Sequence, residues 1–194
     1  GEGPGRTAGY WLALGLVQQY SHDFESALAS LQRAAAIDPQ AVEPPSWKAA
    51  IYMVQARYPE ALEQCKLLEA IASALMAQGC SAYVQASTGQ LAPAFAQLER
   101  ALAQAKDAPP ALQLWTLTRL AEMAQRLQRF DAAEAFYQRA LKLGLPDQFL
   151  LAAYADLHLL RGKNAEVMAL LAGWERSDVL LLRLALAGKA AGDP

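Results

Sequence analysis

Small and apolar residues recur along the chain at intervals that fit helices packed in pairs. The segments FESALASLQRAAAIDP (24–39) and FDAAEAFYQRALKLGLP (130–146) both begin with phenylalanine and end in proline. Each carries an alanine three residues after the phenylalanine and another seven residues later, so the two alanines lie two helical turns apart on one face. Small residues on one face allow a second helix to approach closely. The pattern therefore predicts an all-α protein built from repeated helical hairpins.

The first alanine of each segment belongs to a longer series. Equivalent small residues are Ala27, Ala61, Ala94, Ala133 and Val167, and the intervals between them are 34, 33, 39 and 34 residues. One hairpin cannot bury its own apolar face, so successive hairpins are expected to stack. The predicted organisation is a flexible lead-in over residues 1–7 and a single array over residues 8–194. Its repeats span 8–41, 42–74, 75–108, 114–147 and 148–176, with the first helix of a sixth at 177–190.

The pattern resembles the tetratricopeptide repeat (TPR) family, as found in bacterial proteins. In the first unit, Trp11, Leu14 and Gly15 stand where the family has Trp and its Leu-Gly pair, and the match continues with Phe24, Ala27, Leu31, Ala34 and Pro39. Gln18 replaces an aromatic residue of the family pattern. The resemblance implies a right-handed α-solenoid of helix–turn–helix units whose first helices line a concave groove where peptides commonly bind.

The resemblance also places candidate binding residues in that groove. On the segment that begins near Pro110, Trp115, Arg119, Glu122 and Arg126 form one stripe at spacings of four, three and four. The alternative interpretation of this stripe is an ion-pair ladder in water. The full predicted groove set is Tyr20, Trp47, Tyr83, Trp115, Arg119, Glu122 and Arg126, with Phe149 and Asp156 in the fifth unit. The basic clamp of chaperone-binding relatives is missing, which favours a more apolar or helical ligand.

Catalytic chemistry is not predicted. The only histidines are His22, expected in a solvated turn, and His158, expected to be buried for structural reasons. No metal ligand set, cofactor motif or nucleophile signature is present in the sequence. We therefore expect a non-catalytic scaffold that binds a protein or peptide partner. The alternative is a structural module that assembles through its repeat ends.

The composition of the chain limits the classes of partner that we expect. The chain has 54% hydrophobic and 19% charged residues and a formal net charge of −2. Without a basic stripe, nucleic acid is not an expected partner. No stretch is long and apolar enough to insert into a membrane. Cys65 and Cys80 fit neither a CxxC motif nor a zinc site, and we interpret them as small core residues rather than a disulfide. The cellular compartment is therefore unknown. The cytoplasm is slightly favoured over the periplasm, because a periplasmic location would require a removed signal peptide.

The last predicted helix is apolar nearly all round. Leucine occupies positions 180, 181, 182, 184 and 186, and successive residues lie about 100° apart around a helix. One neighbouring hairpin cannot cover all of them. We expect the chain to be cut from a longer protein, and a weak homodimer to form through this helix.

Overall fold

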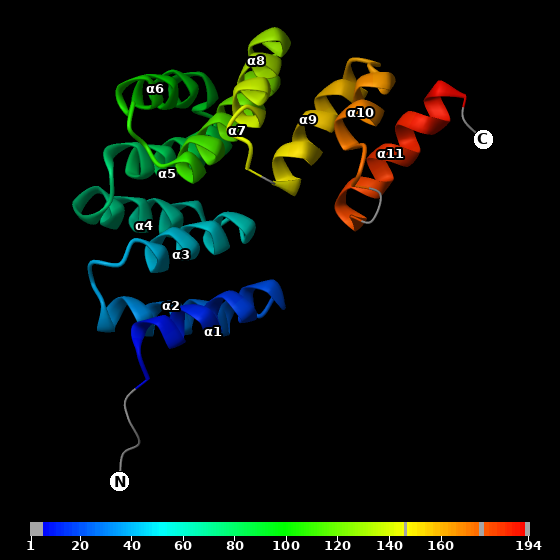
Figure 1. Cartoon of the computed structure of the whole chain (residues 1–194). Coiled ribbons are helices and arrows are strands. Elements are labelled where there is room, and N and C mark those ends of the chain that lie inside the picture. The colour runs from blue at the N-terminus through cyan, green and yellow to red at the C-terminus, as the bar shows by residue number, and fades with distance from the viewer. Residues whose placement is uncertain (1–5, 146, 175–176, 193–194) are drawn as a thin grey trace. The chain divides into compact units, whose positions relative to one another are not determined.

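The computed structural model describes residues 6–145, 147–174 and 177–192, which form eleven helices and no strand (Figure 1). The prediction of an all-α helical-repeat fold is therefore confirmed. Of the expected lead-in, residues 1–5 lie outside the described residues, as does residue 176 at the predicted end of the fifth repeat.

The helices follow one another as hairpins. The bounds are α1 Ala8–Tyr20, α2 Phe24–Ile37, α3 Glu43–Val54, α4 Tyr58–Ile71, α5 Ala74–Ser87, α6 Leu91–Gln104, α7 Pro110–Arg126, α8 Phe130–Leu141, α9 Gln148–Leu160, α10 Asn164–Leu171 and α11 Asp178–Ala191. α1 packs on α2, α3 on α4, α5 on α6, α7 on α8 and α9 on α10. Prolines stand in the first turns of α3, α4 and α7, where the missing N–H costs no helical hydrogen bond.

The chain divides into two compact units, unit 1 over residues 1–106 and unit 2 over residues 107–194. In unit 1, α3 packs on α1 and α2, and α5 packs on α3 and α4. In unit 2, α9 packs on α7 and α8, and α11 packs on α9 and α10. Within each unit, α3, α5, α9 and α11 thus contact both helices of the hairpin before them, which is how hairpin repeats stack. The single array over residues 8–194 stays a prediction.

The small residues of the repeat lie where the two helices of each hairpin meet. Ala27, Ala61, Ala94, Ala133 and Val167 have no exposed surface. The close approach is visible at Gly15 in α1, where an added Cβ would lie 3.0 Å from Leu31 Cγ and 3.4 Å from the carbonyl oxygen of Ala27. The predicted close helix contact is therefore present in the first hairpin.

All five hairpins close through the same backbone turn. The turn residues His22, Ala56, Gly89, Gln128 and Gly162 adopt left-handed conformations, with φ between 56° and 91°. In each case the next residue donates its N–H to the carbonyl five residues earlier, at 2.8–3.0 Å. This hydrogen bond satisfies a carbonyl that the end of the helix would otherwise leave unpaired. The hairpin geometry is thus fixed by the backbone, even at the three positions that lack glycine.

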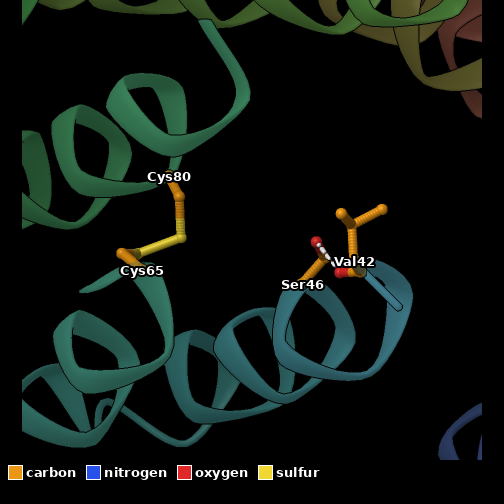
Figure 2. The surroundings of a disulfide bond; sticks show 4 residues. All are labelled: Val42, Ser46, Cys65 and Cys80. Carbon is orange, nitrogen blue, oxygen red and sulfur yellow. Dashed lines mark hydrogen bonds between the residues drawn. A yellow bond between two sulfur atoms is a disulfide. The ribbon is translucent and has the colours of Figure 1, made fainter. Parts of the chain in front are cut away.

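The interpretation of the two cysteines as free core residues is wrong. Cys65 of α4 and Cys80 of α5 form a disulfide, with their Cα atoms 5.4 Å apart (Figure 2). The same view shows Ser46 in the first turn of α3, whose hydroxyl donates to the carbonyl of Val42 at 2.6 Å. The sequence spacing of fifteen residues gave no sign of the bond, because it depends on how α4 and α5 align.

Candidate functional site

The predicted groove residues of unit 1 lie on three neighbouring first helices. Tyr20 at the end of α1 is 73% exposed. Trp47 on α3 is half-buried against a cluster that includes Leu28, Leu31 and Ile51. Tyr83 on α5 is also half-buried. Because α3 packs between α1 and α5, the structure brings the three helices together, and Trp47 serves the packing between hairpins as well as the surface.

The predicted stripe of unit 2 lies along α7. Arg119 Nη1 lies 3.1 Å from Glu122 Oε2, as the spacing of three residues predicts. The Arg119 guanidinium lies 5.9 Å from the centre of the Trp115 ring, at the outer limit of a cation–π contact. Arg126 is exposed one turn beyond Glu122. The stripe therefore contains one ion pair, Arg119–Glu122, and an aromatic residue, 36% exposed, at its N-terminal end.

Glu122 is set apart by its surroundings. Burial raises the pKa of its carboxyl group, and the positive charges of Arg119 and Arg126 act in the opposite direction. Burial penalises the charged form, while a nearby cation favours it. The Arg119–Glu122 pair is thus formed in a partly desolvated place on the helix surface.

A second ion pair joins the next two first helices of unit 2. Arg183 of α11 donates from Nε and Nη2 to the two carboxylate oxygens of Asp156 in α9, both at 2.7 Å. Arg183 Nε also lies 3.2 Å from the carbonyl oxygen of Ala152. Sequence reasoning placed Asp156 in the groove and missed Arg183. A sign was present, because Arg183 begins the same Arg-Leu-Ala sequence that Arg119 begins on α7.

Exposed apolar side chains accompany these ion pairs. Phe149 shares a helix face with Asp156, seven residues away, and is 74% exposed. On α11, Leu186 lies one turn after Arg183 and four residues after Leu182, and both leucines are exposed. We call the following residues of α7, α9 and α11 the first-helix face of unit 2: Trp115, Arg119, Glu122, Arg126, Phe149, Asp156, Leu182, Arg183 and Leu186.

The two histidines have the surroundings that the sequence predicted. His22 is exposed in the α1–α2 turn. His158 is buried on α9, where its ring packs on Tyr154 with centroids 4.3 Å apart, and burial lowers its pKa. Tyr154 in turn stacks on the fully buried Tyr137 of α8. Among the described residues, no group of His, Cys, Asp and Glu could hold a metal ion.

Comparison with known proteins agrees with this architecture. The family model described as a tetratricopeptide repeat matches residues 116–143, which cover most of α7 and all of α8. Residues 116–143 thus match one tetratricopeptide repeat (TPR). Similar solved structures extend the likeness of fold over nearly the whole chain. No protein of curated function matches it.

Three solved structures illustrate that likeness. A thermophilic TPR protein of Thermus thermophilus is 24% identical, with a TM-score of 0.70, covering 96% of this chain and 98% of that one. PilW, a type IV pilus biogenesis factor, is 17% identical, with a TM-score of 0.69, covering 98% and 88%. A TPR protein from Parabacteroides merdae is 18% identical, with a TM-score of 0.65, covering 96% and 73%. At these identities the likeness concerns the fold alone.

No helix within the described ranges has the length and apolar character needed to cross a membrane.

Proposed function

We propose that this protein is a non-catalytic scaffold of the TPR type that binds a peptide or partner segment on the first helices of its hairpins. The observation that carries the proposal is the first-helix face of unit 2, where Trp115, Phe149 and Leu182 expose apolar surface beside two ion pairs. Aromatic residues and arginine are the types enriched where binding energy concentrates. On unit 1, Tyr20, Trp47 and Tyr83 extend the proposal to α1, α3 and α5.

The paired charges favour an apolar or amphipathic ligand. Arg119 and Arg183 already have carboxylate partners in Glu122 and Asp156, so a ligand that offered only a carboxylate would have to compete with them. Apolar side chains on the ligand face no such competition and gain about 1.5–3 kcal/mol for each large residue that is fully buried. An amphipathic helix or an extended apolar segment matches this surface.

A peptide array screened with the full chain tests the proposal. Peptides with regularly spaced large apolar residues are expected to bind, and changing Trp115 or Phe149 to alanine should weaken binding at least tenfold. Leu67→Ala is the matched control, because Leu67 is an exposed apolar residue on α4, a second helix of its hairpin. If Trp115→Ala and Phe149→Ala bind as well as the Leu67→Ala control, the proposed surface of unit 2 is wrong.

The alternative function is self-assembly through α11. Leu180 and Ala187 are buried against the fifth hairpin, while Leu181, Leu182 and Leu186 are each about half exposed or more. A second copy that covered these leucines would remove a contiguous apolar patch from water. Sedimentation across a concentration series should then show a dimer that Leu182→Glu with Leu186→Glu abolishes. A strictly monomeric chain at high concentration would contradict this alternative.

A further inference from the structure

The disulfide joins the second and third hairpins at positions equally far along α4 and α5 from the connection between them. α4 ends at Ile71 and α5 begins at Ala74, and each cysteine lies six residues from the helix end that faces this connection. With a rise of 1.5 Å per residue, each lies about 9 Å along its helix from that end. A bond at this distance from a short connection fixes the angle between the helices. It therefore sets how the third hairpin stacks on the second.

The surroundings of the bond suit a permanent link. Cys65 has no exposed surface and packs in a cluster with Ala49, Ala61 and Val84, while Cys80 is half-buried at its edge. A thiolate that reduces a disulfide must reach one of the two sulfur atoms. The folded hairpins block Cys65 completely and restrict the approach to Cys80. Once formed, the bond is protected from exchange as long as unit 1 is folded.

We infer that this protein folds and works in an oxidising compartment, with Cys65–Cys80 as a structural staple between its second and third hairpins. Disulfides of this kind persist in secreted, periplasmic or lumenal proteins and are rare where thiols are kept reduced. In the forming reaction the two thiols each lose a proton and an electron, and a disulfide oxidant such as oxidised glutathione is reduced to two thiols. The partner of the scaffold is then a protein met in the same compartment.

Trapping the thiols at the moment of lysis tests the compartment. Cells that express the natural gene for the chain are lysed directly into denaturant that contains a maleimide, so that buried thiols also react, and the mass of the chain is measured without reductant. The inference is supported if the chain carries no maleimide at first and gains two maleimide groups only after its disulfide has been reduced. A chain that carries two maleimides before any reduction shows that the cysteines are free in the cell and overturns it.

Stability in defined redox buffers tests the staple. The loop closed by the bond spans fifteen residues, for which the expected shift of the unfolding equilibrium is roughly a hundredfold. The oxidised full chain should therefore melt several degrees above the reduced chain. The Cys65→Ala/Cys80→Ala variant should melt near the reduced chain in both buffers. If oxidised and reduced chains melt together, or if the variant still responds to reductant, the bond is not a staple.

Discussion

Arg183 of α11 holds Asp156 of α9 through two hydrogen bonds of 2.7 Å, so the last helix is fastened to its neighbour by charge as well as by leucines. We predict that Arg183→Met destabilises the chain by about 1–2 kcal/mol, because a bidentate charged pair and a bond to a carbonyl are both lost. Hydrogen exchange should show faster opening of α11 than in the unmodified chain. Lys189→Met, an exposed change on the same helix, is the control and should leave the exchange of α11 nearly unchanged.

Ala56 occupies a left-handed turn position that suits glycine better, with φ of 56°. The left-handed conformation costs an L-residue about 1–2 kcal/mol, which glycine avoids. Glycine also has more conformational freedom in the unfolded state, which offsets only part of this stabilisation. Ala56→Gly should therefore stabilise the chain by about 0.5–1 kcal/mol in chemical denaturation. The same change at exposed Ala50, inside α3, should destabilise it by about 1 kcal/mol. Shifts of the same sign at both positions would contradict this account of the turn.

Ala27 lies opposite Gly15 at the contact between α1 and α2 and has no exposed surface. Ala27→Leu should cost about 1–3 kcal/mol, because the larger side chain overpacks a contact already filled by Leu31. Denaturant unfolding of the variant gives the change in free energy. Ala29→Leu places the same side chain on the exposed face of α2 and is expected to lie within about 0.5 kcal/mol of the unmodified chain. Equal effects at positions 27 and 29 would show that the small residue is not required.

The raised pKa of Glu122 predicts that the stability of the fold depends on pH with a sign that is unusual for a carboxylate. Its pKa is raised in the folded chain, so folding favours the protonated form and the charged form is the less stable one. Relative to Glu122→Gln, the unmodified chain should lose stability as pH rises from the unfolded pKa of about 4.3 to the folded pKa. Above that pKa the difference should be constant.

Paired unfolding curves of the two chains across this range would measure the Glu122 effect, and carboxyl NMR of Glu122 gives the folded pKa directly. A folded pKa below that of an exposed glutamate would mean that the arginines, and not burial, control this group.

The parts of the fold that the sequence could predict are those written in local spacing. The small residues at 27, 61, 94, 133 and 167 recur because every hairpin needs the same close contact, and all are fully buried. The i, i+3 spacing of Arg119 and Glu122 likewise sufficed to predict their pairing.

The contacts that the sequence could not predict depend on how helices of different hairpins align with one another. Cys65 bonds to Cys80, and Asp156 pairs with Arg183, because of the register between helices that belong to different hairpins. No spacing rule within one helix encodes that register. The left-handed turns at His22, Ala56 and Gln128 were hidden for another reason, since none of these residues is a glycine. These residues adopt the left-handed conformation despite its cost in free energy, because the hydrogen bond from the next N–H to the carbonyl five residues earlier requires it.

The self-contained closure of each turn has an evolutionary consequence. Every hairpin completes its own backbone hydrogen bonds at the turn, without borrowing a donor or acceptor from the next one. A gene segment of about 34 codons can then be duplicated or deleted while leaving the closures of the other turns intact. Selection on such a gene acts mainly on the side chains at the joints between copies. The inter-hairpin disulfide and the Asp156–Arg183 pair are two joints where a new neighbour would have to supply a matching residue.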